Sequence, residues 1–372
     1  MKGIVDVDSQ PQGRVLYVTV GAPEHGVVRH GRQTAAALRR VGAEVELLTA
    51  EDVAAFRGLV PLLEEARALG AAVHLDVTDA LFGPTATAAA DLLVDVLPEG
   101  TTLTLHDIPQ PAEGDGRYRR RGEAYARLAQ AAAGVVVSSQ HERALLADLV
   151  DVAADVVPLP VEDRRAAAAR AEPVVPESMA GLDQDVVLFG FVYPGKGYER
   201  VIEAAPAGVL VRALGAVATG HDDYAAQLSA LAAERGVDFE VTGYVPDSAL
   251  AAELDAVTVP VCPHRHVSAS GSLNTWIAHN RRVVVADGPY MREVAERWPE
   301  RVVLAGERDP GQDAAVVHDA PGRASAGDVP DLATAIESML GDPASAWCAE
   351  PPPAWGWPEL AAAYTRLWSE LT

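Results

Sequence analysis

The segment from Val186 to Ala204, VVLFGFVYPGKGYERVIEA, combines the patterns of a strand, a loop and a helix. Its apolar start, VVLF, predicts a buried strand, and its end, YERVIEA, has the spacing of a helix. The loop between them holds one lysine, Lys196, among glycine and proline residues. Backbone amides at a helix start, together with an ammonium group, suit an anion such as a diphosphate. The segment therefore predicts one unit of an α/β fold with an anion-binding loop, formed by Gly190, Gly195 and Lys196.

The rarity of lysine in this chain supports a specific role for the loop. Of its 30 basic residues, only Lys2 and Lys196 are lysine, and all the others are arginine. An internal lysine in such a chain indicates a position where arginine is not an adequate substitute. The alternative is a surface turn with a solvated lysine. A Walker loop is excluded, because the Gly-Lys-Ser/Thr ending of that motif is absent: Gly197 directly follows Lys196.

Short β-branched runs alternate with alanine-rich helical stretches on both sides of this segment, which is typical of parallel sheets built from βαβ units. In the first half we expect strands near residues 14–20, 44–49, 72–76, 101–106, 134–138 and 155–159. In the second half we expect them near residues 186–191, 209–213, 238–242, 257–261, 282–286 and 302–305. The predicted fold class is α/β, with two facing doubly wound, Rossmann-like domains.

Two domains are the expected organisation for 372 residues with this pattern. Residues 171–184 contain two prolines and a glycine without a sustained period, which is typical of an interdomain linker. We expect a first domain over residues 1–172, a linker over 173–184, a second domain over 185–345 and a C-terminal segment over 346–372. The last helix, expected at 359–371, has one apolar face, formed by Leu360, Tyr364, Leu367 and Leu371.

The net charge of −23 argues against nucleic acid or an anionic membrane as a partner. The densest basic cluster is interpreted as the solvated start of a helix, and it consists of Arg117, Arg119, Arg120 and Arg121. No apolar run approaches the ~20 residues that cross a bilayer. Residues 1–14 lack the pattern of a secretion signal, and Cys262 and Cys348 are too few for a disulfide framework. We therefore expect a cytoplasmic protein without an integral membrane segment.

A second anion-binding candidate lies in the stretch VSASGSLNTWIA, residues 267–278. Ser270, Gly271 and Ser272 precede an apolar helix, and free amides with serine hydroxyls at such a start can hold a phosphate. The serines are also ordinary helix caps. We favour binding because this loop and the Lys196 loop should open at the same edge of one sheet.

Two candidate loops belong to the first domain. His106 and Asp107 lie at the carboxyl end of the strand expected at 101–106, where the ligand-facing residues of α/β sheets are found. The alternative is that a lone histidine at a strand end is structural, but the pair is a candidate for binding a sugar hydroxyl. The loop GAPEHG follows the first strand and supplies Gly21, His25 and Gly26. It lacks Gly-x-Gly-x-x-Gly, which argues against a dinucleotide site.

The stretch Cys262-Pro-His-Arg-His266 permits two interpretations. Cys262, His264 and His266 could converge on a metal, but no carboxylate or fourth ligand is near in sequence. We favour a cluster that faces an anion, with Arg265 directed toward phosphate, and we expect no metal site.

With these residues, the chain resembles the retaining glycosyltransferases of the GT-B fold, and among them family 4, also called glycosyl transferases group 1. Gly21–Leu48 resembles the family's opening glycine loop, helix and second strand, and Leu105–Asp107 resembles its histidine-containing strand end. Gly190–Glu203 resembles the donor-phosphate loop, and Ser268–Asp287 resembles the segment that binds the donor nucleotide and sugar. The likeness covers nearly the whole chain. It implies a first domain that binds the acceptor, a second that binds the donor, and a final helix that crosses back to the first.

The chain departs from the family's pattern at three positions. Phe191 stands where family members usually have an arginine that contacts the diphosphate. The family's two glutamates, separated by seven residues, correspond approximately to Ser268 and Trp276, so the Glu-x7-Glu motif is degenerate. Arg265 or His266 is the candidate for the missing cation.

The resemblance implies transfer of a sugar from a UDP- or GDP-linked donor to an acceptor hydroxyl, with retention of configuration. Lys196 and the helix start at Gly271 and Ser272 would neutralise the leaving diphosphate, so neither a metal nor a cofactor is expected. His106 would orient the transferred sugar. The absence of a basic amphipathic helix favours a small-molecule or other soluble glycan acceptor.

Other functions stay open. A GT-B relative could form a non-glycosidic bond or epimerise a nucleotide sugar, and a non-catalytic subunit could keep only nucleotide-sugar binding. A nicotinamide-dependent oxidoreductase is disfavoured by the absent glycine fingerprint. The sequence does not indicate the oligomeric state, the donor base or the identity of the acceptor.

Overall fold

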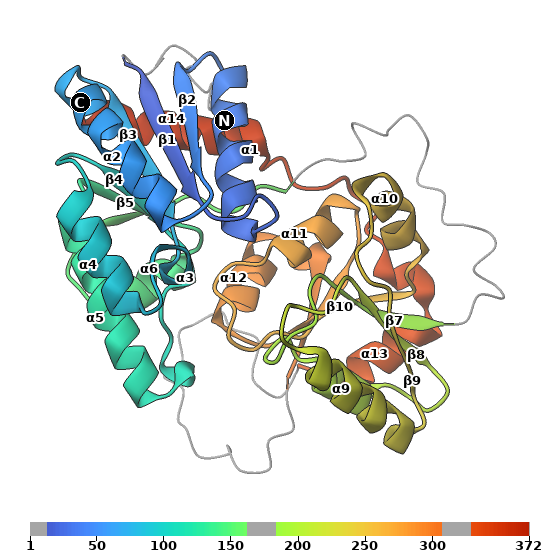
Figure 1. Cartoon of the computed structure of the whole chain (residues 1–372). Coiled ribbons are helices and arrows are strands. Elements are labelled where there is room, and N and C mark those ends of the chain that lie inside the picture. The colour runs from blue at the N-terminus through green and yellow to red at the C-terminus, as the bar shows by residue number, and fades with distance from the viewer. Residues whose placement is uncertain (1–12, 162–183, 307–328, 372) are drawn as a thin grey trace. The chain divides into compact units, whose positions relative to one another are not determined.

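The computed structural model describes residues 13–161, 184–306 and 329–371. These residues form two compact units. The first comprises the described residues up to Pro160 together with those from Trp355 onward, and the second comprises the described residues between them. Each unit is built on a six-stranded parallel sheet with helices on both faces (Figure 1). The predicted α/β class is therefore confirmed.

The first sheet has the strand order β2-β1-β3-β4-β5-β6. Its strands are β1 (Val15–Val20), β2 (Val45–Ala50), β3 (Ala72–Val77), β4 (Thr102–Leu105), β5 (Gly134–Val137) and β6 (Ala154–Val156). Side chains of β1 alternate between the two faces, because successive residues of a strand point in opposite directions. Leu16, Val18 and Val20 join one core cluster, whereas Val15 and Tyr17 join another.

Two groups of helices cover the two faces of the first sheet (Figure 1). One face carries α2 (Val53–Ala68), α3 (Asp79–Phe82), α4 (Ala86–Val96), α5 (Asp115–Ala131) and α6 (Gln140–Ala147). The other carries α1 (Gly26–Arg40) and the last helix, α14 (Trp357–Leu371). The expected apolar face of α14 is present, since Leu360, Tyr364 and Leu367 are buried there.

A polar network joins α14 to the sheet beneath it. The Tyr364 hydroxyl lies 2.7 Å from Thr104 Oγ1, and Trp368 Nε1 donates to Thr102 Oγ1 at 3.2 Å. The ring nitrogens of His74 lie 2.7 Å from Thr102 Oγ1 and 2.9 Å from Thr104 Oγ1. His74 is completely buried, so this network must be satisfied internally.

The second sheet has the order β12-β11-β10-β7-β8-β9. Its strands are β7 (Asp185–Phe189), β8 (Leu210–Leu214), β9 (Asp238–Val241), β10 (Val259–Cys262), β11 (Val283–Ala286) and β12 (Val302–Ala305). One face is covered by α8 (Tyr198–Ala204), α9 (Asp222–Arg235) and α13 (Leu332–Gly341). The opposite face is covered by α10 (Asp247–Ala256), α11 (Gly271–Ala278) and α12 (Pro289–Arg297).

All twelve expected strands are present, with ends that differ from the predicted ones by a few residues. The expected linker lies outside the described residues, apart from Gln184. The stretch before Trp355 belongs to the second unit, because Arg282 N and Arg281 Nε both donate to Ala346 O, and Asn280 Nδ2 donates to Cys348 O. None of the described helices is both long and apolar enough to span a membrane.

Candidate functional site

The first group of candidate residues lies where β4 ends. His106 directly follows β4, and its amide donates to Val77 O of the neighbouring strand at 2.8 Å. The residue is buried, with 8% of its surface exposed. Asp107 is exposed and has a φ of 55°, a left-handed conformation that is uncommon for a residue with a side chain. The chain therefore turns sharply at His106 and leaves the imidazole at the edge of the sheet.

Helix α5 holds this turn in place. The Tyr125 hydroxyl donates to His106 O at 2.8 Å, and Arg121 Nη2 donates to Asp107 O at 2.9 Å. Thr78 Oγ1 also donates to the Asp107 carboxylate, at 3.2 Å. These contacts stabilise a backbone conformation that would otherwise be disfavoured.

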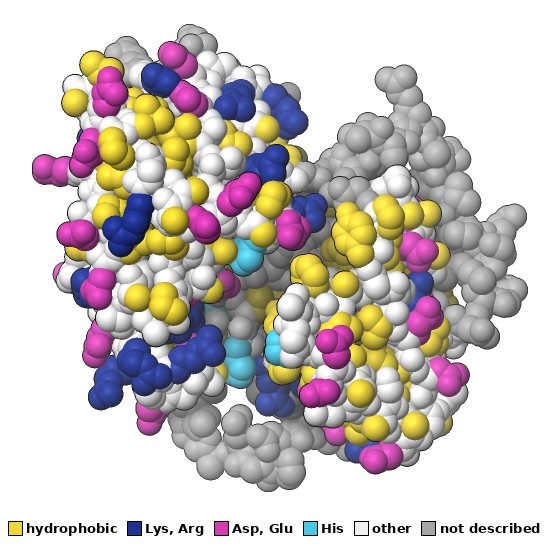
Figure 2. Space-filling model, in the orientation of Figure 1, with side chains coloured by type: hydrophobic (Ala, Val, Ile, Leu, Met, Phe, Trp, Pro, Cys, Tyr) yellow, Lys and Arg dark blue, Asp and Glu magenta, His cyan; other side chains and the backbone are white. Residues whose placement is uncertain are grey.

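Arg121 corrects the interpretation of the basic cluster. Arg117, Arg119 and Arg120 are exposed, as expected for a solvated helix start, and dark-blue basic side chains gather over the lower end of α5 in Figure 2. The Arg121 side chain, in contrast, is only 11% exposed and forms ion pairs with Asp79 and Glu113. The charge of Arg121 therefore stabilises the fold through these ion pairs, which could not be predicted from spacing along the chain.

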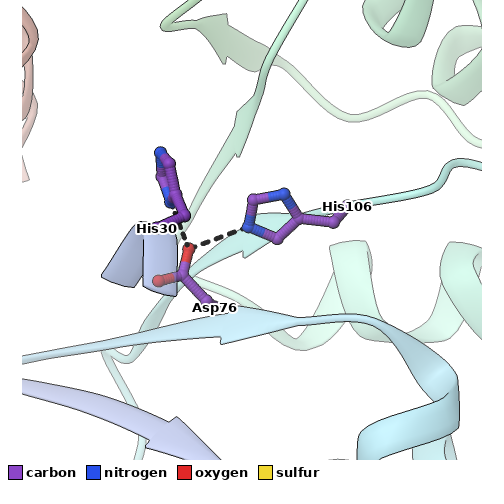
Figure 3. A group of neighbouring side chains, drawn as sticks. All are labelled: His30, Asp76 and His106. Atoms are coloured by element: carbon purple, nitrogen blue, oxygen red, sulfur yellow. Dashed lines mark hydrogen bonds and ion pairs between the residues drawn. The ribbon is translucent and has the colours of Figure 1, made fainter. Parts of the chain in front are cut away.

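Two residues that the sequence analysis missed lie beside His106 (Figure 3). His106 Nε2 is 2.9 Å from Asp76 Oδ1, and His30 Nδ1 is 3.5 Å from the same oxygen. Asp76 comes from β3 and His30 from α1. The sequence offered one signal for Asp76, because this carboxylate stands at the end of a predicted apolar strand. In the structure that strand pairs with β4, the strand that His106 follows.

The close approach of α1 to Asp76 depends on Gly31. A Cβ atom at this position would lie 2.3 Å from Asp76 Oδ2 and 2.4 Å from Thr19 Cγ2. No side chain fits in that space, so the glycine allows the helix to bring the adjacent His30 next to the carboxylate.

Burial and hydrogen bonding oppose each other in this cluster. Burial disfavours the ionised form of Asp76, but the hydrogen bond from His106 and the nearby imidazole of His30 outweigh it and hold the pKa of Asp76 well below its usual range. Burial likewise lowers the pKa of His106, whereas the hydrogen bond to Asp76 raises it, and the net shift is upward. Asp76 is therefore a buried anion stabilised by imidazole donors.

The same three side chains place two imidazole nitrogens and a carboxylate oxygen within 4.8 Å of one another. This donor set would also suit a divalent transition metal. In this structure His106 forms a hydrogen bond with Asp76, and His30 forms a longer contact with the same carboxylate oxygen.

The expected acceptor-side loop has mostly structural contacts. Gly21 directly follows β1, has a φ of 118°, and its amide donates a hydrogen bond to Ala50 O. His25 precedes α1 and accepts a hydrogen bond from Val27 N at Nδ1, at 3.3 Å, so it caps the helix. Gly26 is the first residue of that helix and has open space around it.

The second group of residues lies in the loop that follows β7. Gly190, Gly195 and Gly197 have φ values of 108°, 91° and 89°, so the loop depends on glycine at these turns. Lys196 folds back over the loop, and its Nζ donates to Phe189 O at 2.6 Å. The side chain is largely buried, which lowers the pKa of Lys196 to about 8.

Strand β10 brings a second loop beside the first, because β7 and β10 are neighbours in the sheet. Burial lowers the pKa of His264 to about 3, and the charge of Lys196 adds to this effect. The Nδ1 atom of His264 is buried and has no hydrogen-bond partner among the described residues. Burial raises the pKa of the Cys262 thiol to about 12, while Lys196 acts in the opposite direction. Lys196 therefore lies close enough to Cys262 and His264 for its charge to act on both.

The serine-rich stretch reaches the same environment. Ser270 caps α11 by accepting from Leu273 N at 3.2 Å, which agrees with the alternative that the serines are caps. Ser270 Oγ also lies 3.2 Å from Ser272 Oγ, and Ser272 Oγ lies 4.0 Å from Cys262 Sγ. Gly271, the first residue of α11, has nothing within 4 Å of the position a Cβ would take. The helix start is thus both capped and open to an additional group.

Three further residues near these loops differ in their exposure to solvent. Arg265 is exposed and lies close enough to Arg200 for its charge to contribute, after burial, to lowering the pKa of Arg200 to about 10. Phe191 is 52% exposed. Trp276, which corresponds approximately to one of the family's glutamates, is completely buried. It packs against Phe189, with 6.2 Å between the centroids of the two rings. The Trp276 side chain therefore belongs to the core and does not replace a ligand-binding carboxylate.

No protein-family model matches the sequence, and neither does any curated protein. Solved structures do match. Sucrose-phosphate synthase from Thermosynechococcus elongatus is 16% identical with a TM-score of 0.62, over 96% of this chain and 99% of that chain. HepE from Anabaena, in complex with UDP and glucose, is 15% identical with a TM-score of 0.59, over 96% and 95% of the two chains.

A third similar structure is WaaG, a glycosyltransferase involved in lipopolysaccharide biosynthesis. It is 14% identical with a TM-score of 0.57, and 95% of each chain is covered. At such low identities the likeness concerns the fold. It extends over nearly the full length of this chain, and this chain has the two-unit GT-B architecture.

Proposed function

We propose that this protein is a glycosyltransferase that moves a sugar from a nucleotide diphosphate donor to an acceptor hydroxyl. The proposal rests on the position of Lys196. Its ammonium group is largely buried at the carboxyl end of β7, in a loop that contains three glycines with positive φ. Ligands of open α/β sheets bind at the carboxyl ends of the strands. A buried cation at this edge suits the diphosphate of a donor, and the similar structures include one in complex with UDP-glucose.

The donor diphosphate would lie between Lys196 and the start of α11. Lys196 supplies a charge, while Ser272 and the amides near Gly271 supply hydrogen-bond donors. The buried Nδ1 of His264 can donate to the same group. These groups would stabilise the negative charge that develops on the leaving diphosphate, so we propose a reaction that needs neither a metal nor a cofactor.

We also propose a role for His106, which belongs to the first unit. An imidazole nitrogen at the carboxyl end of β4 can hydrogen-bond a sugar hydroxyl, and the Tyr125 and Arg121 contacts keep it in place. We extend the proposal to a UDP- or GDP-linked sugar, a small-molecule or other soluble acceptor, and retention of configuration. Retention rests on the likeness of the Lys196 loop and His106 strand end to those of retaining enzymes.

The test is to incubate the protein with UDP-, GDP- and dTDP-sugars and to measure nucleotide release with and without EDTA. We expect slow donor hydrolysis by the wild type, unaffected by EDTA. Lys196→Met should lower the rate about 10²–10³-fold, because it removes a charge that acts on the leaving group. Arg235→Ala, which breaks an exposed ion pair with Glu203, serves as the control and should leave the rate unchanged.

A non-catalytic nucleotide-sugar-binding subunit is the second candidate. It is favoured by the half-exposed Phe191, which stands where an arginine is expected, and by the buried Trp276. Tight binding of a nucleotide sugar without release of nucleotide would support this function and contradict the first.

A further inference from the structure

The hydrogen bonds of Asp76 restrict the protonation of His106. Asp76 is completely buried, and its Oδ2 accepts a hydrogen bond from the Tyr17 hydroxyl at 2.9 Å. Its Oδ1 is 2.9 Å from His106 Nε2 and 3.5 Å from His30 Nδ1. An ionised carboxylate can only accept hydrogen bonds. His106 must therefore donate to it through an Nε2–H group.

The other ring nitrogen of His106 is left for a ligand. Figure 3 shows Nδ1 on the side of the ring that points away from Asp76. About 10% of the His106 side chain is exposed, whereas Asp76 is inaccessible. Because Nε2 keeps its proton in both the charged and the neutral ring, Nδ1 is the atom that gains or loses a proton.

We propose that Asp76 is the positioning residue of His106: it retains the proton on Nε2 and so presents Nδ1 to the substrate. The neutral ring then accepts a hydrogen bond from a substrate hydroxyl at Nδ1, and the charged ring donates one. This inference rests on the proposed function for the identity of the substrate, although the protonation pattern itself belongs to the free protein.

Several charged groups act on the His106 ring. Asp76 on β3 and Glu142 on α6 favour the imidazolium, as does the adjacent Asp107. On the α1 side, His30 faces Asp76, and His25 interacts with His106 unfavourably when both are charged. Asp76 is the only one of the carboxylates that hydrogen-bonds the ring in the described part of the chain.

Imidazole ¹⁵N NMR on uniformly labelled protein without substrate tests the proposal. His106→Gln identifies the His106 signals. In the wild type at high pH, we expect Nε2 to show the chemical shift of a protonated nitrogen and Nδ1 that of an unprotonated one. Asp76→Asn should move the His106 titration midpoint to lower pH by about one to three units, because it removes a neighbouring anion. Asp91→Asn, on the exposed surface of α4, is the matched control and should cause no shift.

An Nδ1–H tautomer of neutral His106 in the wild type would overturn the proposal, and this holds even if Asp76→Asn does not fold. A change in the His106 NMR signals on addition of EDTA would show that a metal binds His30, Asp76 and His106, and it would also overturn the proposal. In turnover assays, Asp76→Asn should shift the pH profile of kcat/KM to lower pH by the same amount as the His106 titration midpoint. A wild type that shows the expected NMR pattern but releases no nucleotide would contradict the proposed function alone.

Discussion

A Cβ atom on Gly190 would lie 2.5 Å from the Nζ of Lys196, so the ammonium occupies the space that a side chain at Gly190 would fill. Gly190→Ala should displace the ammonium and strain a backbone with a φ of 108°. We expect UDP affinity, measured by calorimetry, to fall about tenfold or more.

Gly195→Ala separates displacement of Lys196 from backbone strain. Gly195 has a similar φ of 91°, but no atom lies within 4 Å of the position that a Cβ would take there. This variant should lose stability while keeping most of its UDP affinity. Equal losses of UDP affinity in Gly190→Ala and Gly195→Ala would contradict a specific role for the position of the Lys196 ammonium beside Gly190.

The pH dependence of UDP binding should reflect Lys196. Burial lowers the pKa of this lysine to about 8, and only the charged form attracts a diphosphate. As pH rises from 7 to 9, the free protein loses the charge and the affinity should fall, approaching about tenfold per pH unit above the pKa. Calorimetry on Lys196→Met should show weak binding without this additional decline. The same decline in both proteins would exclude Lys196 as its cause.

Two glycines inside helices should respond to alanine in opposite directions. Gly31→Ala in α1 would place a methyl group against Asp76 and Thr19, and we expect it to destabilise the protein by about 1–3 kcal/mol. Gly58→Ala in α2 meets no neighbour and should stabilise it by about 0.5–1 kcal/mol. Urea unfolding measures both changes. A neutral Gly31→Ala would show that α1 can move away from Asp76 without cost.

Acid should destabilise the protein partly through His74. Burial lowers the pKa of His74 to about 4. Between pH 6.5 and 4 the unfolded chain binds a proton at this residue that the folded chain does not, so the free energy of unfolding falls as the pH falls. The loss attributable to His74 is on the order of 3 kcal/mol.

His74→Gln isolates this contribution. The variant keeps a polar side chain beside Thr102 and Thr104 but has no group that titrates in this range. Urea unfolding at pH 7 and pH 4.5 should show a smaller decrease in the variant than in the wild type. Equal decreases would mean that the His74 network does not resist protonation.

Most of the fold could be predicted because the alternation of apolar strands and helices is a local pattern. Most strands of the two sheets contain β-branched residues, and glycines such as Gly42, with a φ of 89°, follow the ends of helices. Lys196 could be singled out as well, since its rarity and its glycine-rich surroundings are properties of the sequence.

The surroundings of the candidate residues could not be predicted, because they depend on side chains that meet across the sheet. Arg121 was expected to be solvated, yet it lies against Asp79 and Glu113, which are 42 and 8 residues away. The burial of Trp276 depends on which face of α11 packs on the second sheet. Neither outcome follows from spacing along the chain.

The sequence by itself determined two doubly wound units and a lysine loop at the carboxyl end of β7, because periodicity and glycine placement act over a few residues. Only the tertiary structure decided which groups control the chemistry. His106 is paired with Asp76, 30 residues away, because parallel pairing sets β3 beside β4. His30 joins them because Gly31 lets α1 approach the sheet closely.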